Sequence, residues 1–171
     1  MCSSDLPRAQ YLRTSHPLTL ADAALEYAGP LRRKWDCLDE ALKGKPHFSD
    51  SIFQAVAEDT SRCFAHHRML RSYARHDYAP LVPLLPMFGA QTVIDAGGGT
   101  GELASLMAAQ HPALEVVLLD LPGVVEQREA LAPGTFRAIG TDLFKPWPVN
   151  ADLIVFARVL HDWNDVDASR L

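Results

Sequence analysis

The stretch Thr92-Val93-Ile94-Asp95-Ala96-Gly97-Gly98-Gly99-Thr100-Gly101 joins an apolar run to an acid and four glycines. Its β-branched residues predict a short strand buried in a parallel sheet. The glycines predict a tight turn with positive φ, against which a ligand can lie. The residues from Glu102 to Gln110 predict the helix that follows the turn. Together these features are typical of a nucleotide-binding turn.

The spacing of the glycines distinguishes two kinds of nucleotide cofactor. Gly97, Gly99 and Gly101 form the pattern G-x-G-x-G, whereas dinucleotide-binding turns have one more residue before the last glycine. The spacing therefore favours S-adenosylmethionine over NAD. A strand-to-helix turn that binds no ligand is the alternative as long as the glycines are considered alone.

Composition and charge exclude several classes of protein. The chain has 171 residues, 48% of them hydrophobic, and a net charge of -5. We therefore expect no broad nucleic-acid surface, and no apolar run approaches the ~20 residues that would span a bilayer. The three cysteines are too few and too scattered for a disulfide framework or a zinc site. We expect a cytoplasmic protein with no metal, no nucleic-acid partner and no membrane partner.

The two ends of the chain predict a piece of a larger protein. Residues 1–6 look like a translated sequencing adapter, and we expect residues 1–16 to be non-native or disordered. The helix that begins at Asp165 has no C-cap signal before the chain ends. We predict a helical segment over residues 17–88 and the first half of a cofactor-binding domain over residues 89–171.

Residues 19–75 carry the period of α-helices. Apolar residues at three- and four-residue steps predict one helix up to the Gly29-Pro30 break and a second over residues 31–44. A third helix is expected to run from a cap at Ser49 or Asp50 towards Tyr73.

Two adjacent histidines, His66 and His67, lie inside the third predicted helix. Neighbouring residues of a helix point about 100° apart, so this pair cannot chelate one metal ion. We expect both histidines to face solvent or a partner and assign them no chemistry.

Three further strands are expected after the glycine turn. Residues 114–119 end at Asp120, residues 136–139 lead to Asp142, and residues 151–157 lead to His161. In open parallel sheets the ligand lies outside the carboxyl ends of the strands. These three residues and Gly97 are therefore predicted to converge at one edge of the sheet, which is the main argument for a site.

Each of these residues has a chemical role and a structural alternative. Asp120 lies where a strand-end carboxylate reaches ribose hydroxyls, but it also precedes a predicted helix over residues 124–131 and can cap it. Asp142 can accept a hydrogen bond from an adenine amino group while Leu143 packs on the ring, or it can be a plain turn residue. Histidine titrates near neutral pH, so His161 is suited to remove a proton from a hydroxyl. Its alternatives are packing under Trp163 or capping the next helix.

Four segments carry a family resemblance: Asp95-Ala96-Gly97-Gly98-Gly99-Thr100-Gly101, Leu119-Asp120-Leu121-Pro122, Gly140-Thr141-Asp142-Leu143-Phe144 and Leu160-His161-Asp162-Trp163-Asn164-Asp165. In order and spacing they resemble the S-adenosylmethionine-dependent small-molecule O-methyltransferases. This group includes plant caffeic acid and flavonoid enzymes and bacterial natural-product and pigment tailoring enzymes. Trp35-x-x-Leu38 and Gly44-Lys45-Pro46-His47-Phe48 resemble the family's W-x-x-L and G-x-P-x-F stretches.

The resemblance implies an α/β fold, with a Rossmann-like methyltransferase sheet whose first four parallel strands, in the order 3-2-1-4, are present. It implies S-adenosyl-L-methionine as the cofactor and His161 as the base that deprotonates the hydroxyl of a small-molecule acceptor. The cofactor-binding residues that it implies are Gly97, Gly99, Gly101, Asp120, Leu121, Asp142, Leu143 and Arg158. A module that is non-catalytic or that methylates carbon is the alternative.

The sequence also departs from the family pattern. Plant members usually have methionine at the position of Leu143 and lysine at that of Ala157, so one cofactor contact is lost or passes to Arg158. The resemblance implies a homodimer formed by a winged-helix domain, most of which is absent, and three more strands after Leu171. Residues 153–157 would then lie at a sheet edge, and we expect the chain alone to be poorly soluble and inactive.

Overall fold

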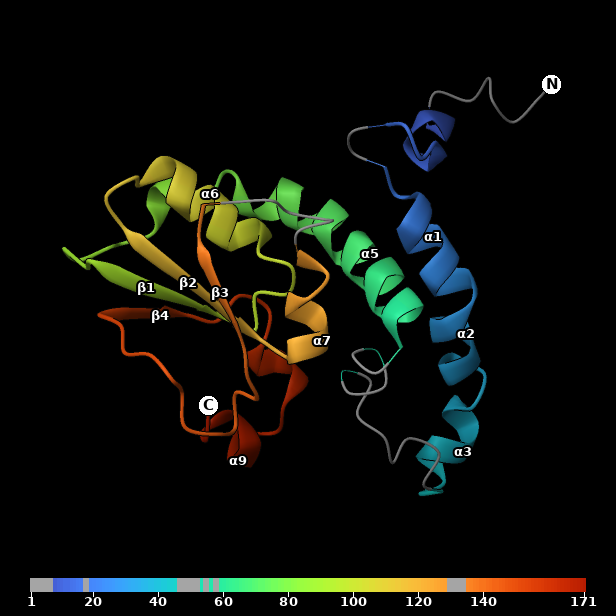
Figure 1. The fold of residues 1–171 in the computed structure, drawn as a ribbon. Helices are drawn as coiled ribbons and strands as arrows, with labels where there is room; N and C mark the ends of the chain where they lie inside the picture. Colours follow the sequence, from blue (N-terminus) through green and yellow to red (C-terminus); the bar gives the residue numbers. More distant parts are fainter. Residues whose placement is uncertain (1–7, 17–18, 46–52, 54–55, 57–58, 129–134) are drawn as a thin grey trace. The chain divides into compact units, whose positions relative to one another are not determined.

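The computed structural model describes residues 8–16, 19–45, 53, 56, 59–128 and 135–171. The chain divides into two compact units, Met1–Tyr73 and Ala74–Leu171. Helices make up most of the described part of the first unit, and the second contains the sheet (Figure 1). No helix of the described residues is long and apolar enough to cross a membrane.

The first unit contains the helices η2 (Ala9–Leu12), α1 (Ala21–Ala28), α2 (Pro30–Trp35), α3 (Leu38–Leu42) and most of α5 (Thr60–Tyr78). The predicted break at Gly29-Pro30 is confirmed. The prediction of one helix over residues 31–44 is wrong, because a turn at Asp36 and Cys37 separates α2 from α3. Aspartate and cysteine have low helix propensity, which accounts for the interruption.

The third predicted helix is interrupted, because Phe53 and Val56 are helical but Asp59 is not, and the part after the interruption, α5, ends later than the sequence predicts. Its expected cap at Ser49 or Asp50 lies outside the described residues. The helix begins at Thr60, where the Asp59 Oδ1 atom accepts a hydrogen bond of 2.9 Å from the Arg62 amide, and it continues to Tyr78. A carboxylate that accepts from the first turn is the usual device that starts a helix.

The prediction that His66 and His67 face solvent or a partner is wrong. His67 is only 8% exposed, and the His66 Nδ1 atom lies 3.7 Å from the Glu26 Oε1 atom of α1. Arg62 donates to the same oxygen at 3.1 Å, so charged groups of α1 and α5 meet beside these rings. Burial lowers the pKa of His67 to about 4. Among the described residues, no group of three or more His, Cys, Asp or Glu is placed to hold a metal ion.

The second unit contains a parallel sheet of four strands: β1 (Thr92–Ala96), β2 (Glu115–Asp120), β3 (Arg137–Gly140) and β4 (Leu153–Val155). Their order is β3-β2-β1-β4, which confirms the predicted order 3-2-1-4. Strand β4 is shorter than predicted, because only three of its residues pair with β1. The register places Asp120 beside Gly140.

Helices of the second unit include α6 (Glu102–Gln110), whose bounds agree with the prediction, and α7 (Pro122–Val125). The prediction of a helix over residues 124–131 is wrong in its bounds, because α7 begins at Pro122 and ends at Val125, where a turn at Glu126 and Gln127 follows; residues 129–131 lie outside the described part of the chain. The 3-10 helix η3 (Val82–Leu84) precedes β1, while η4 (Leu160–Asp162) and α9 (Asp165–Ala168) follow β4.

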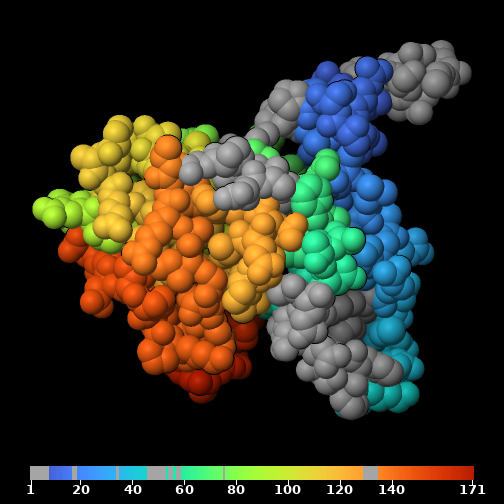
Figure 2. All heavy atoms as spheres, viewed as in Figure 1, coloured from blue at the N-terminus to red at the C-terminus, as the bar shows by residue number. Residues whose placement is uncertain are grey.

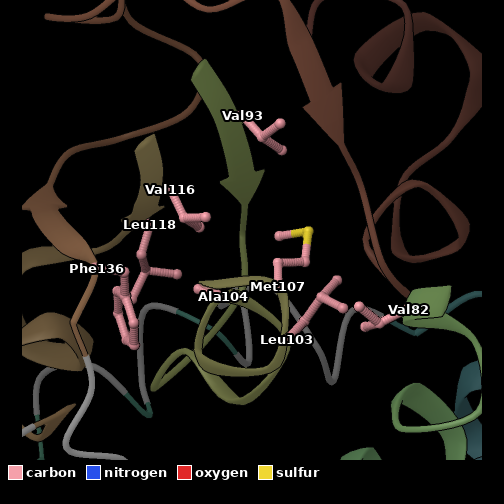
Figure 3. Packing of buried hydrophobic residues seen from close by; sticks show 8 residues of the cluster. All are labelled: Val82, Val93, Leu103, Ala104, Met107, Val116, Leu118 and Phe136. Carbon is pink, nitrogen blue, oxygen red and sulfur yellow. The ribbon is translucent and has the colours of Figure 1, made fainter. Parts of the chain in front are cut away.

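The two faces of the sheet bury different partners, because successive side chains of a strand point to opposite sides. Figure 3 shows the first core, in which α6 packs against β1 and β2; it consists of Val82, Val93, Leu103, Ala104, Met107, Val116, Leu118 and Phe136. On the other face, Ile94, Ala96, Val117 and Leu119 pack against residues of the segment that follows β3. Atoms of β3 and of that segment, coloured orange, form much of the middle of the surface of the sheet unit on the side shown in Figure 2.

Candidate functional site

The turn between β1 and α6 requires glycine at three positions. Gly97, Gly99 and Gly101 have φ values of 71°, 63° and 91°, a conformation that other residues rarely adopt. Two of them also lack room for a side chain. A Cβ atom on Gly97 would lie 2.8 Å from a methyl carbon of Val159, and one on Gly101 would lie 2.3 Å from the ring of Phe136.

Gly98 is restricted by a buried acid and not by its φ angle. A Cβ atom there would lie 2.3 Å from the Asp95 Oδ2 atom. The Asp95 side chain is 0% exposed, and its Oδ2 atom accepts a hydrogen bond of 3.1 Å from the Ala104 amide in α6. Its Oδ1 atom has no hydrogen-bond partner in the described part of the chain. Burial raises the pKa of Asp95 to about 7, and the nearby charge of Asp120 adds to this shift.

Asp120 connects the end of β2 to the glycine turn. Its Oδ2 atom accepts a hydrogen bond of 2.7 Å from the Gly99 amide, and its Oδ1 atom accepts one of 2.7 Å from the Leu121 amide. The N-cap of α7 is Leu121, without a side-chain cap bond, so the helix-cap alternative for Asp120 is wrong. Burial raises the pKa of Asp120 to about 6, although the two amide donors oppose the shift.

Backbone hydrogen bonds hold three strand ends together at this turn. The Gly97 amide donates to the Leu119 carbonyl at 2.8 Å, and the Thr141 amide donates to the Asp120 carbonyl at 2.7 Å. The segment after β3 also reaches the turn, because a Leu143 methyl carbon lies 3.5 Å from where a Gly97 Cβ atom would be. The turn, the end of β2 and the segment after β3 therefore form one continuous surface.

Asp142 is a turn residue in the structure, as the alternative to a cofactor contact predicted. Its Oδ1 atom accepts a hydrogen bond of 3.0 Å from the Phe144 amide, and its Oδ2 atom lies 3.9 Å from the Lys145 ammonium. These contacts close a turn of the Asx type. The contact of Asp142 with an adenine ring stays a prediction.

The chain reaches the same edge of the sheet after β4. Arg158 has a φ of 60°, which is uncommon for a residue other than glycine, and its guanidinium lies 3.3 Å from the Asp77 carboxylate at the end of α5. The next residue, Val159, packs on Gly97. The turn at Arg158 thus brings the segment that carries His161 to the glycine turn.

His161 lies in η4 with its side chain 63% exposed, and its Nε2 atom is 3.3 Å from the Asp162 Oδ1 atom. The ring of Trp163 meets that of Phe144 edge to face, with centroids 4.7 Å apart. The side chain of Asn164 caps α9 by accepting from the Asp167 amide. His161 therefore neither packs under Trp163 nor caps α9. Its imidazole is accessible and lies beside a carboxylate.

The sheet unit also has a hollow of about 420 Å³ at the opposite end of β1 and β4. Its lining residues are Met87, Phe88, Gly89, Ala90, Gln91, Asp152 and Leu153. The Asp152 carboxylate already accepts from the amides of Gln91 and Thr92, both at 2.9 Å. The predicted site residues lie at the other end of the strands.

Two links at the site were not predicted from the sequence. The hydrogen bond from the Gly99 amide to Asp120 depends on the register between β1 and β2, and the contact of Gly98 with Asp95 depends on the path of the backbone through the turn. The only sequence signal for the second is a fourth glycine at a position that the G-x-G-x-G pattern leaves free. A parallel sheet, a glycine turn and an acid at the end of the second strand together define an α/β domain of the nucleotide-cofactor-binding class.

Comparison with known proteins identifies the family within this class. The profile of the O-methyltransferase domain matches residues 36–171, so the chain belongs to this family. It is 39% identical over 146 residues to caffeic acid 3-O-methyltransferase of Eucalyptus gunnii, covering 85% of this chain and 36% of that protein. It is 29% identical over 160 residues to the mitomycin biosynthesis 6-O-methyltransferase of Streptomyces lavendulae, covering 88% and 46%.

A solved structure has the same fold. Human N-acetylserotonin methyltransferase in complex with S-adenosylmethionine aligns with a TM-score of 0.82 at 23% identity, covering 95% of this chain and 50% of that one. The chain thus spans about half the length, or less, of these relatives.

Proposed function

We propose that this protein transfers a methyl group from S-adenosylmethionine to a hydroxyl group of a small molecule. The observation that carries the proposal is the Asp120 carboxylate, which is bonded to the Gly99 amide where β1 and β2 end. Membership of the O-methyltransferase domain family supports the reaction class. The mitomycin and caffeic acid enzymes support a small aromatic or natural-product acceptor, since their names specify such substrates.

The residues at the turn fit this cofactor. The positive φ angles of Gly97, Gly99 and Gly101 form the tight turn, and Asp120 offers a carboxylate at the place where ribose hydroxyls bind in folds of this kind. We assign the cofactor to Gly97, Gly99, Gly101, Asp120, Leu121, Asp142, Leu143 and Arg158. The human relative that was solved with S-adenosylmethionine supports the assignment.

His161 is proposed as the general base. When bound, the cofactor supplies a methyl group that is already electrophilic, because it is attached to a positively charged sulfur. The protein then needs only to orient the acceptor and to remove its hydroxyl proton. The His161 imidazole is accessible to an acceptor, and its Nε2 atom lies 3.3 Å from the Asp162 carboxylate. No metal ion takes part in this proposal.

The protein is further proposed to act as a homodimer through its helical unit. Leu25, Trp35 and Leu42 of this unit are 71%, 65% and 80% exposed, an unusual amount of large apolar surface for short helices. Sedimentation of the protein should give the mass of two chains. A monomer at micromolar concentration would contradict this part of the proposal.

Calorimetry with three ligands tests the proposed cofactor. S-adenosylmethionine and S-adenosylhomocysteine should both bind, whereas NAD should give no heat, because the turn lacks the longer glycine spacing of dinucleotide sites. Methyl transfer to a panel of phenols and hydroxylated aromatic acids then tests the reaction. Binding of NAD alone would overturn the proposed function.

A further inference from the structure

The most unusual group at the turn is the buried carboxyl of Asp95. It is fully buried, with one oxygen bonded to the Ala104 amide and the other without a hydrogen-bond partner in the described residues. A buried carboxylate normally satisfies both oxygens, because an unpaired charge in the interior is costly. The missing hydrogen bond to the Asp95 Oδ1 atom therefore needs an explanation.

Gly98 shows what this carboxyl supports. A Cβ atom at this position would lie 2.3 to 2.7 Å from all three atoms of the Asp95 carboxyl group. The carboxyl thus lies directly behind the backbone of the turn. Through its Oδ2 atom it also holds the first turn of α6, so it connects the two elements that the turn joins.

A second carboxyl, that of Asp120, lies against the same turn. Asp120 accepts a hydrogen bond from the Gly99 amide. The turn therefore contacts two acids, Asp95 of β1 and Asp120 of β2. The nearby titratable group from α5 is Tyr78, whose pKa is raised by burial and then by the charge of Asp95. Arg158 lowers the pKa of Tyr78 and Asp77 raises it, so one cation and one further acid act near this phenol. Burial next to other acids favours a neutral Asp95 when no ligand is bound.

We propose that Asp95 is a positioning residue for the glycine turn and that its carboxyl releases a proton when cationic S-adenosylmethionine binds. This inference rests on the proposed function. On binding, the O–H bond of the carboxyl breaks, its electron pair stays on the oxygen, and the proton passes to the buffer. The ionised Asp95 and Asp120 then offset the positive charge of the ligand from behind the turn.

The raised pKa of Asp95 agrees with its buried position, in which the carboxyl is partly protonated near pH 7 before the ligand binds. Burial raises its pKa to about 7, whereas that of Asp120 is raised only to about 6. A cationic ligand lowers both values, so protons are released on binding and affinity increases with pH. At pH 7, Asp120 is already mostly ionised, and the released proton comes mainly from Asp95.

The test is calorimetry of S-adenosylmethionine binding in phosphate and in Tris, two buffers that differ in ionisation enthalpy. The wild-type protein should release about half a proton per bound ligand at pH 7 and almost none at pH 8.5. Its dissociation constant should fall roughly three- to tenfold between pH 6 and pH 8.5. Binding without proton release at pH 7 would overturn the inference and leave the proposed function intact.

Two variants assign the proton. Asp95→Asn keeps the acceptor for the Ala104 amide and should abolish the release at pH 7 while S-adenosylmethionine still binds. Glu115→Gln, which removes an exposed carboxyl at the start of β2, should leave the release unchanged. A release that persists in Asp95→Asn would assign the proton elsewhere and overturn the inference.

If Asp95→Asn does not fold, the pH series of the wild-type protein still decides, because the proton release must vanish by pH 8.5. Absence of binding to the wild type would overturn the proposed function, and this inference with it.

Discussion

The glycine turn and the segment after β4 approach the same sheet edge, but the structure holds them in different ways. The turn is bonded through Gly97, Gly99 and Asp120 to the end of β2, and Asp95 lies buried behind it. The segment after β4 is held by the packing of Val159, the contact between the rings of Trp163 and Phe144 and the ion pair of Arg158 with Asp77, and it presents an exposed His161. Buried hydrogen bonds therefore hold the turn, the rigid half of the site, whereas side-chain packing and an exposed ion pair hold the segment after β4, its exposed half.

The largest expected effect comes from a substitution in the exposed segment after β4. His161→Ala should lower turnover by roughly 10²–10⁴ and leave the affinity for S-adenosylmethionine almost unchanged, as expected when a general base is removed. His76→Ala, which removes an exposed histidine of α5, is the matched control and should change neither quantity. A parallel loss of cofactor affinity in His161→Ala would instead make His161 a structural residue.

The next largest effect comes from a substitution in the glycine turn and concerns the stability of the fold. In Gly101→Ala, the added methyl group would overlap the ring of Phe136 and strain a residue with a φ of 91°. We expect the free energy of unfolding to fall by about 2–4 kcal/mol in urea titrations, from overpacking and backbone strain together.

Gly89→Ala separates these two causes. Gly89 has a φ of 79°, but nothing lies within 4 Å of its Cβ position, so only the strain of about 1 kcal/mol should remain. Equal losses in Gly89→Ala and Gly101→Ala would show that contact with Phe136 does not restrict the turn.

Asp120→Ala tests whether the rigid half also binds the cofactor. The substitution removes the charged acceptor of the ribose hydroxyls, and cofactor affinity should fall by about 1.5–3 kcal/mol. Calorimetry measures the loss, with Glu115→Ala as a control on the same strand. Unchanged affinity would mean that Asp120 only holds the turn.

The smallest effect concerns the ion pair beside Arg158. Asp77→Asn breaks a contact of 3.3 Å between two half-exposed groups, and such pairs contribute at most about 1 kcal/mol. Stability and cofactor affinity should both change by less than this amount, and 0.5 M salt should remove the difference. A tenfold loss of affinity would reveal that the segment after β4 depends on α5 much more than its contacts indicate.

Periodicity and spacing were sufficient for the sheet unit. The bounds of α6 and the existence of four strands were predicted, because buried strands and a helix opened by a glycine turn leave local signals. The order of the strands was predicted from the family resemblance. The helical unit was predicted less well, since the turn at Asp36, the start of α5 at Thr60 and the burial of His66 and His67 all differ. Its short helices bury few of their apolar residues, so periodicity alone did not determine where they end.

By itself, the sequence determined the glycine turn, the family and the strand ends at which site residues are expected, because each of these is encoded within a few consecutive residues. The tertiary structure alone decided which side chain meets which backbone atom. The hydrogen bond from the Gly99 amide to Asp120 requires β1 and β2 in register, and the hydrogen bond from the Ala104 amide to Asp95 requires α6 to pack against the end of β1. Such contacts join residues that only the packed sheet brings together, so their energies and pKa shifts depend on burial, which a linear pattern does not contain.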